Sequence, residues 1–287
     1  MKFKILIILS FVLSAFFTSC GDSDVTVIGN WVNKGYLESK PRSDGSSFAI
    51  NNFGYWGMGK DEDDYLTDFW KYNPEKNSWV EVAKFEGSPR AYNVSISNGV
   101  KGYVGLGYYK NNNLADFWEY DPATDKWTQL PDFPGGARHM ATAFAIGTDI
   151  YVGSGYDQKN KLYLNDFYKF SNGTWTKITA LTGEKRYSAS SVGFNGKGYV
   201  LSGYHSGVLQ DFWEYDPATD SWKQLSKLND EDNGGNTAVA RYNASIFVSE
   251  SKIYLVGGTT SGTSLATCFE WDPSTLEWTE KTAIESG

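Results

Sequence analysis

Hydrophobic positions along this chain fall into short runs, not into long amphipathic stretches. The runs are rich in Val, Ile, Tyr, Phe and Trp and are bounded by Gly, Asn, Asp and Pro, a pattern that is typical of β-strands. Beyond the N-terminal apolar run, no segment shows a sustained apolar period of about 3.6 residues, the period of an amphipathic helix. The pattern therefore predicts an all-β protein.

The runs recur with a fixed period. Tryptophans mark the period at intervals of 48, 48, 48, 47 and 56 residues, at Trp31, Trp79, Trp127, Trp175, Trp222 and Trp278. Such self-similarity indicates an array of equivalent supersecondary units. Five units are complete, over residues 42–87, 90–135, 138–183, 186–228 and 241–282.

Each unit holds four apolar runs. In the fourth unit we expect strands over 188–194, 198–203, 211–215 and 221–225. Asn195-Gly196 supplies the positive φ angles of a tight hairpin, and Asp216-Pro217 is typical of a type I turn. Because the connections are so short, successive strands must be antiparallel neighbours, and each unit is a four-stranded meander.

A single meander of this size cannot bury its faces, so copies must stack, and stacking around an axis gives a β-propeller. The Arg that opens each unit, the Gly at the end of its second strand, the aromatic-Asp-Pro corner and the Trp six residues after that Asp resemble kelch repeats over about residues 40–282. The resemblance implies a kelch-type β-propeller. We expect five blades, with Val25–Asn33 as an extra strand laid where the last blade meets the first; six blades are the alternative.

The N-terminus predicts export. Lys2 and Lys4 precede an apolar run, Ile5–Phe17, that is too short to span a bilayer. Phe17-Thr18-Ser19-Cys20 resembles a bacterial lipobox, which implies a signal peptide over 1–19, a tether over 20–24 with a lipidated Cys20, and a propeller domain over 25–287. An ordinary signal peptide is the alternative. We expect a monomeric outer-membrane lipoprotein of a Gram-negative-type bacterium, on its periplasmic or cell-surface side, held to the membrane by its lipid alone.

Charge and cysteine content narrow the possible functions. The net charge is −8, and clusters such as Asp61–Asp64 lie in predicted loops, which argues against nucleic-acid binding. Cys268 is the other cysteine of the chain, and its place in a predicted strand indicates a small buried residue.

The connections between second and third strands are long and differ from unit to unit. Variable loops on a rigid scaffold are where binding sites usually lie, so we expect the ligand there, at the mouth of the central channel. The candidate ligand-binding residues are Arg90, Arg138, Arg186, Arg241, Tyr92, Tyr187, Tyr242, Tyr108, Tyr156, Tyr204, His139 and His205.

Arginines in every unit, Arg42 included, have two interpretations. A ring of guanidinium groups with flanking tyrosines suits anionic peptides or sugars, and kelch adaptors bind acidic peptides with matching arginines. The alternative is that each arginine is a structural part of the repeat, bonded to carbonyls of a neighbouring blade. The repeated aspartates Asp68, Asp116, Asp166 and Asp211 are interpreted as structural hydrogen-bonding residues, and the repeated tryptophans as packing between blades.

Catalysis is not favoured by the sequence. Galactose oxidase-like chemistry implies a copper site with two His and two Tyr, but His139 and His205 lie in different units and different kinds of segment. We expect no cofactor and no metal. A carbohydrate-active enzyme similar to sialate mutarotases is the alternative function, although no acid–base pair stands out. The sequence thus favours a non-catalytic recognition module for a glycan or protein ligand.

Overall fold

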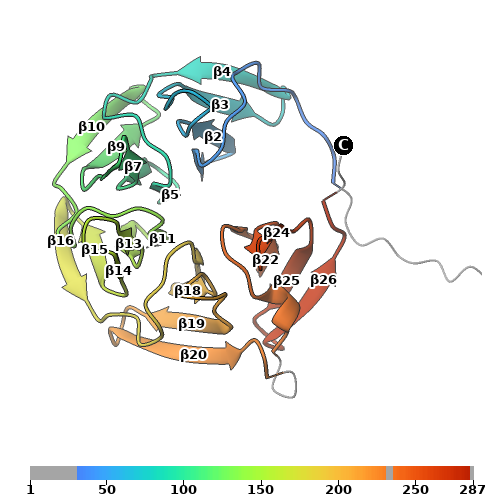
Figure 1. The fold of residues 1–287 in the computed structure, drawn as a ribbon. Helices are drawn as coiled ribbons and strands as arrows, with labels where there is room; N and C mark the ends of the chain where they lie inside the picture. The colour runs from blue at the N-terminus through green and yellow to red at the C-terminus, as the bar shows by residue number, and fades with distance from the viewer. Residues whose placement is uncertain (1–30, 231–234, 285–287) are drawn as a thin grey trace, which may run out of the picture.

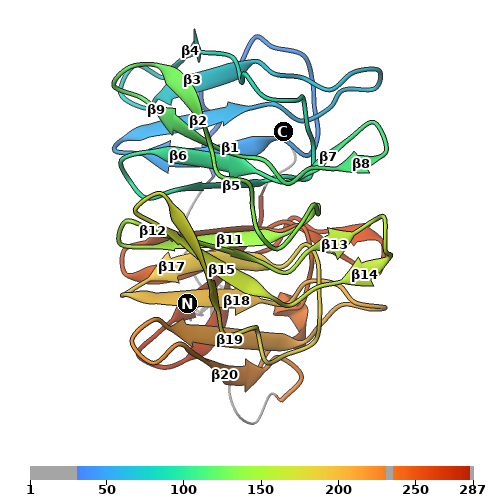
Figure 2. The ribbon, with the colours of Figure 1, turned by 90° about the vertical axis from the view of Figure 1, so that its left-hand side faces the viewer.

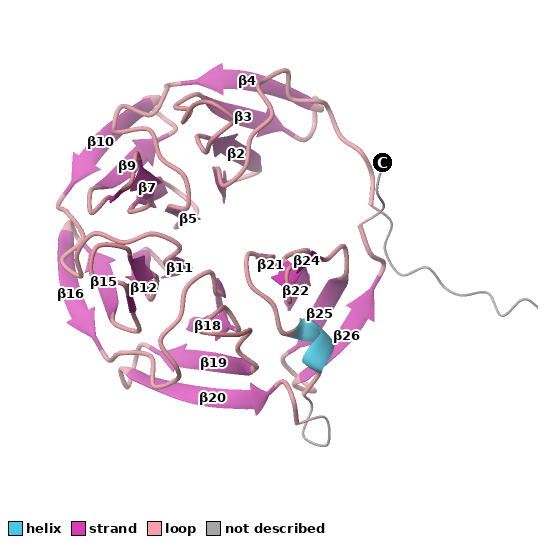
Figure 3. Ribbon diagram, viewed as in Figure 1, coloured by secondary structure: helices cyan, strands magenta, loops and turns pink. Residues whose placement is uncertain are grey.

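The computed structural model describes residues 31–230 and 235–284. The predicted signal peptide, Cys20 and the tether lie outside these residues. Five four-stranded antiparallel sheets form a five-bladed β-propeller, which confirms the predicted fold class (Figure 1). The helix found among the described residues is the 3₁₀ helix η2, Thr237–Val239, which is drawn in cyan in Figure 3.

Each blade runs outward from its first strand, with its strands in chain order. Blade 1 is β1 (Ser46–Ile50), β2 (Phe53–Gly57), β3 (Phe69–Asn73) and β4 (Ser78–Val82). Blade 2 is β5 (Val94–Ser97), β6 (Gly102–Gly105), β9 (Phe117–Asp121) and β10 (Lys126–Leu130). Blade 3 is β11 (Thr142–Ile146), β12 (Asp149–Gly153), β15 (Phe167–Ser171) and β16 (Thr174–Ile178). Blade 4 is β17 (Ser190–Phe194), β18 (Lys197–Leu201), β19 (Asp211–Asp216) and β20 (Ser221–Lys227). Blade 5 is β21 (Ser245–Ser249), β22 (Lys252–Val256), β25 (Cys268–Asp272) and β26 (Glu277–Lys281).

The turn chemistry of blade 4 explains its strand boundaries. Asn195 and Gly196 both have positive φ, at 48° and 73°, as a type I′ hairpin requires. At the outer corner the Asp216 side chain accepts a 2.9 Å hydrogen bond from the Ala218 N–H, which closes the turn. The strands therefore begin and end within two residues of the predicted positions.

The core of the described residues consists of four hydrophobic clusters, and each lies between two successive blades. In blades 1 to 4 a phenylalanine of the third strand packs on the fourth-strand tryptophan of the next blade, as in the Phe167–Trp222 pair with ring centroids 5.0 Å apart. The indole N–H of Trp222 also donates to the Thr179 carbonyl of blade 3 at 2.9 Å. This geometry confirms that the repeated tryptophans pack between blades.

The ring is open at one place. Neighbouring inner strands contact each other from β1 through β5, β11 and β17 to β21, whereas β21 and β1 make no comparable contact in the described part of the chain. Figure 1 shows the open sector between the blue blade 1 and the red blade 5. The segment that precedes blade 1 runs along the outer side of this sector, where the Trp31 indole N–H donates to the Thr282 carbonyl at 2.9 Å. This agrees with the expected position of the extra N-terminal strand, although residues 25–30 lie outside the described part.

Candidate ligand-binding site

The long loops lie on one face of the ring. Three of them fold into small hairpins, formed by β7 (Tyr108–Tyr109) with β8 (Asn112–Asn113), β13 (Tyr156–Asp157) with β14 (Leu162–Tyr163), and β23 (Thr259–Thr260) with β24 (Thr263–Ser264). Figure 2 shows that β7–β8 and β13–β14 project on the same side of the propeller. The residues that precede the inner strands pair with these loops, as in the bridges from His139 to Tyr156 and from Tyr187 to Tyr204. The predicted mouth residues are thus brought together.

The arginines of this face are buried. Arg90, Arg138, Arg186 and Arg241 are at most 1 % exposed. Arg90 Nη1 donates to Asp116 Oδ1 at 2.9 Å and to the Leu106 carbonyl at 3.1 Å, and its Nη2 donates to Asp116 Oδ2 at 2.6 Å. Equivalent two-bond ion pairs link Arg42 to Asp68, Arg138 to Asp166 and Arg186 to Asp211.

This geometry corrects the expected ring of open guanidinium groups. A ligand at the mouth cannot reach guanidinium groups that are shielded from solvent and held by carboxylates and carbonyls. Each ion pair joins two residues of the same blade. The arginine side chains also donate to carbonyls of the segment that arrives from the preceding blade, as Arg90 Nε does to Ser88 at 3.0 Å and Arg138 Nη2 does to Gly135. The main chain adds a second link, for example through the Gly107 N–H, which donates to the Arg138 carbonyl at 2.9 Å.

Blade 5 departs from this arrangement because Thr267 replaces the aspartate. Arg241 Nη1 donates to the Gly257 carbonyl at 2.6 Å, and Nη2 donates to the Ala238 carbonyl at 2.7 Å. No carboxylate pairs with it among the described salt bridges, and burial lowers the pKa of the guanidinium group. The Thr267 Oγ1 atom is buried without a hydrogen-bond partner in the described residues.

Aromatic rings form a continuous surface across blades 2 to 5, which we call the aromatic belt. Its members are Tyr92, Tyr108, His139, Tyr156, Tyr163, Tyr187, Tyr204, His205 and Tyr242. Tyr163 stacks on Tyr187 with centroids 5.6 Å apart and planes 11° apart, and Tyr204 meets Tyr242 edge to face at 5.2 Å. All the tyrosines of the belt are partly exposed, so their rings are held by neighbours and still reach solvent.

The two histidines of the belt have different environments. His139 is 8 % exposed, burial lowers its pKa, and its Nδ1 lies 2.7 Å from Asn113 Oδ1. His205 lies above the Tyr163 ring at 4.5 Å, with Nδ1 2.8 Å from Glu184 Oε2. Each histidine ring is thus held in the belt by its own side-chain partner. In the described residues no group of three or more His, Cys, Asp and Glu side chains is arranged to hold a metal ion.

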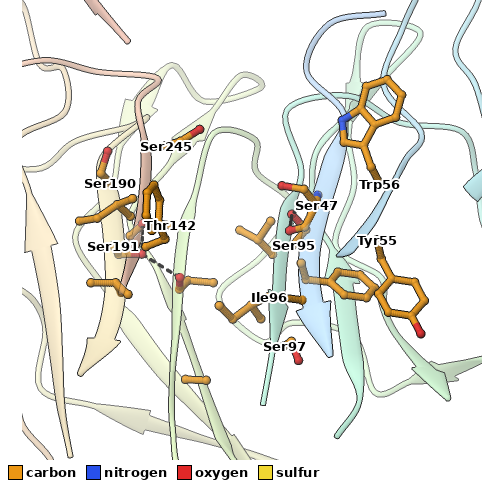
Figure 4. Close-up of a pocket in the computed structure, with 18 of the residues that line it drawn as sticks. Ser47, Tyr55, Trp56, Ser95, Ile96, Ser97, Thr142, Ser190, Ser191 and Ser245 are labelled. Carbon is orange, nitrogen blue, oxygen red and sulfur yellow. Dashed lines mark hydrogen bonds between the residues drawn. The ribbon is translucent and has the colours of Figure 1, made fainter. Parts of the chain in front are cut away.

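The belt lies at one end of a cavity of about 1140 Å³. Asn93, Ala141, Ala189 and Ala244 line the cavity, and each follows a belt residue by one or two positions. Below them the lining is rich in hydroxyl groups, which Figure 4 shows on neighbouring inner strands. Thr142 Oγ1 donates to Ser191 Oγ at 2.5 Å, and Ser95 Oγ donates to the Ser47 carbonyl at 3.1 Å. The hydroxyls therefore tie inner strands of successive blades together.

Two parts of this site were not predicted from the sequence. Tyr163 was not predicted, because only the β13–β14 pairing of Tyr156 with Tyr163 brings it to the belt. The hydroxyl-rich lining was also missed; its signal is a Ser or Thr at the first or second position of every inner strand, such as Ser95, Thr142 and Ser190.

Comparison of the sequence with models of known protein families agrees with the repeat pattern and with this geometry. A family model described as the KLHDC2/KLHL20/DRC7 Kelch-repeats domain matches residues 131–286, and a Kelch motif model matches residues 102–134. The first match covers more than half of the chain, so the chain belongs to the kelch-repeat family. A search of curated proteins found no significant match. The kelch propeller is a fold that fits a non-catalytic binding module.

Proposed function

We propose that this protein is a non-catalytic recognition module that binds a protein ligand through the aromatic belt. The observation that carries the proposal is the unbroken series of ring contacts from Tyr92 to Tyr242 on the loop face, in which every tyrosine is partly exposed. Tyrosine is enriched at protein interfaces because it supplies a large rigid contact area at a low entropy cost and keeps a polar tip. A belt held by ring-to-ring contacts is organised before the ligand arrives, which favours affinity.

The chemistry of the belt favours a partner segment with apolar or aromatic side chains and free backbone groups. Its rings offer faces and hydroxyl groups, while Arg90, Arg138 and Arg186 are occupied by aspartates and Arg241 by backbone carbonyls. Charged groups of both signs lie beside the belt, with Lys60 Nζ 5.3 Å from the Tyr92 ring, Asp157 next to Tyr156 and Glu184 beside His205. The ligand does not need to be acidic, in contrast to the expectation from an arginine ring.

The test uses the full chain with Cys20→Ser, which keeps it from being lipidated. A displayed random-peptide library and a glycan array are probed with this protein and with Tyr187→Ala and Tyr204→Ala. We expect selected peptides to bind, and each variant to weaken binding about tenfold or more, as removal of a central interface tyrosine does.

Tyr36 provides the matched control, because it is 92 % exposed and lies outside the belt. Tyr36→Ala should bind like the parent, and all variants should keep the parent's melting temperature. Peptides that bind equally to parent and belt variants would contradict the proposal. Glycan binding that disappears with Tyr187→Ala would assign the belt to carbohydrate instead.

Membrane attachment is a separate part of the proposal and rests on the sequence alone. The short apolar run that ends at Cys20 supports lipidation and anchoring at the outer membrane. Among the described residues no helix is long and apolar enough to cross a membrane. In a bacterial host, Cys20→Ser should leave the membrane fraction, and unchanged detergent partitioning would count against the anchor.

A further inference from the structure

The open sector of the ring is bounded by a blade face that is built to receive another blade. Gly54, Tyr72 and Trp79 of blade 1 line the cavity, at the positions that Gly198, Tyr215 and Trp222 hold in blade 4. In blade 4 these positions pack against blade 3: Phe144 lies 6.2 Å from the Tyr215 and Trp222 rings, and Phe167 lies 5.0 Å from Trp222.

The glycines show the difference most directly. A Cβ added to Gly198 would lie 2.1 Å from Cε2 of Phe144, and one added to Gly102 would lie 2.2 Å from Cζ of Phe48, so both glycines are required by a ring of the preceding blade. A Cβ on Gly54 would meet only Tyr72 of its own blade, at 3.7 Å. Gly54 therefore provides room for a phenylalanine that blade 5 does not supply.

Blade 5 presents the opposite face of the sector. Phe247 stacks on Tyr254 with centroids 5.5 Å apart, as Phe144 does on Tyr151 at 5.0 Å. Phe144 is fully buried, whereas Phe247 is 42 % exposed and its neighbour Val248 is 39 % exposed. Both residues line the same cavity as Tyr72 and Trp79, so the central channel extends between the two unpartnered faces.

The outer edge of the sector already carries the bonds of a fourth strand. Trp31 Nε1 donates to the Thr282 carbonyl after β26 at 2.9 Å, just as Trp127 Nε1 donates to the Ala83 carbonyl after β4 at 3.0 Å. On the other side the Gly35 N–H donates to Asn77 Oδ1, as the Ala83 N–H does to Asp125 Oδ1. The segment around Trp31 thus links blade 5 to blade 1 as a fourth strand of a blade would.

The chain also leaves blade 5 in the direction of the sector. The Ile284 N–H donates to the Ala266 carbonyl at 2.8 Å, the same bond that Phe133 makes to Ala115 and Leu181 makes to Asn165. In those two blades the chain reaches the arginine of the next blade five residues later, at Arg138 and Arg186.

From these contacts we infer that the open sector binds a three-stranded antiparallel β-meander with the kelch pattern, joined on the C-terminal side of Ile284. The meander would place aromatic rings on Gly54, Tyr72 and Trp79 and pair with the segment around Trp31 as its fourth strand, completing a sixth blade. This inference does not depend on the aromatic belt.

The test supplies such a meander from the chain itself. A copy of residues 137–171, which contains β11, β12 and β15, is attached directly after Gly287, so that the copied Arg138 follows Ile284 by five residues. The copy presents Phe144 and Phe167, the side chains that blade 4 receives from blade 3. We expect one unfolding transition at a temperature at least about 5 °C above the parent's, because the docked copy would bury apolar surface that the parent leaves exposed.

Two variants separate a docked blade from a mere extension. Attaching the same copy with Phe144→Ser and Phe167→Ser should remove the gain. Gly54→Ala should leave the parent's melting temperature within about 1 °C but remove most of the gain in the extended chain, because its Cβ would meet the docked ring. A second extension, a copy of residues 41–73 with Phe48 and Phe69, repeats the test with a different blade, so that the result does not depend on whether one copy folds.

Three outcomes would overturn the inference. The first is that neither extension raises the melting temperature. The second is that the serine copy raises it as much as the native copy. The third is a parent that is a dimer by light scattering and becomes a monomer with Trp79→Ser, which would show that a second copy of this chain covers the two faces.

Discussion

Arg90 and its equivalents have a structural role, although an arginine ring at a channel mouth is typical of a site for anionic ligands. The guanidinium group is buried against the Phe85 ring at 4.8 Å and shares two hydrogen bonds with Asp116. Removing one partner of a buried pair leaves an uncompensated charge, which typically costs about 3–5 kcal/mol. These pairs therefore fix the start of blades 1 to 4.

Blade 5 offers a way to test this role by adding a partner. Thr267→Asp should raise the free energy of unfolding by about 1–2 kcal/mol, because a carboxylate would face the buried and unpaired Arg241. The midpoint of urea unfolding measures the change. Thr267→Asn has the same shape without the charge and should give less than half of the gain; equal gains would mean that hydrogen bonding alone is responsible.

Acid should weaken the pair in blade 1. Burial by itself raises the pKa of Asp68. Hydrogen bonds from Arg42, Trp70 and Ser39, together with the positive charge of Arg42, outweigh burial and lower the pKa to about 2. Because the folded pKa lies below the ordinary value of 3.8, the stabilisation is complete above about pH 4 and is lost as the pH falls towards 2. The loss should reach about 2 kcal/mol.

Asp68→Asn tests this pH dependence. The variant should be less stable than the parent at pH 7, and its stability should fall less steeply between pH 4 and 2 when urea midpoints are compared. Parallel pH profiles for the two proteins would show that Asp68 does not titrate in this range.

The sequence revealed both members of each pair but not that they meet. Arg90 and Asp116 are 26 residues apart, and their recurrence fits either a binding ring or a structural contact. Burial decides between the two, and burial at a loop-strand junction depends on how the whole unit folds. Tyr187 and Tyr204 were both predicted at the channel mouth, and the structure pairs them because they flank the same two strands.

At the scale of strands and blades, alternation and turn residues were sufficient to predict the meander. In β1 the burial alternates from Ser46 through Phe48 to Ile50, as the period of a strand requires. The small hairpins such as β7–β8 were predicted only as loops, because two-residue strands of Tyr and Asn carry no periodic signal.

The blade interfaces predict unequal effects of the same substitution at two equivalent glycines. Gly102→Ala should destabilise the protein by about 1–3 kcal/mol, the usual cost of overpacking, because its Cβ would lie 2.2 Å from the Phe48 ring. Gly54→Ala should change stability by less than about 0.5 kcal/mol, since the nearest atom is 3.7 Å away. Thermal unfolding of both variants checks the contrast, and similar losses would show that Gly54 also faces a packed neighbour.

At the scale of the whole molecule, stability should be uneven around the ring. Each of the three middle blades shares a hydrophobic cluster with both neighbours, whereas blades 1 and 5 each share one. In an array of repeats, stability is approximately the sum of the repeat and interface contributions, so the end blades should open before the middle ones. The repeat period predicted the number of blades, but not this asymmetry, which depends on the ring being open.

Amide hydrogen exchange measures the asymmetry. Second strands lie inside their sheets in every blade, so β12 of blade 3 can be compared with β2 of blade 1 and β22 of blade 5. We expect β12 amides to exchange at least about tenfold more slowly, which corresponds to about 1.4 kcal/mol of additional opening free energy. The chain extended by residues 137–171 provides the matched comparison, because covering both end faces should bring β2 and β22 towards the protection of β12. Equal protection of all three strands in the parent would mean that the five blades unfold as one unit and that the open sector does not weaken its borders.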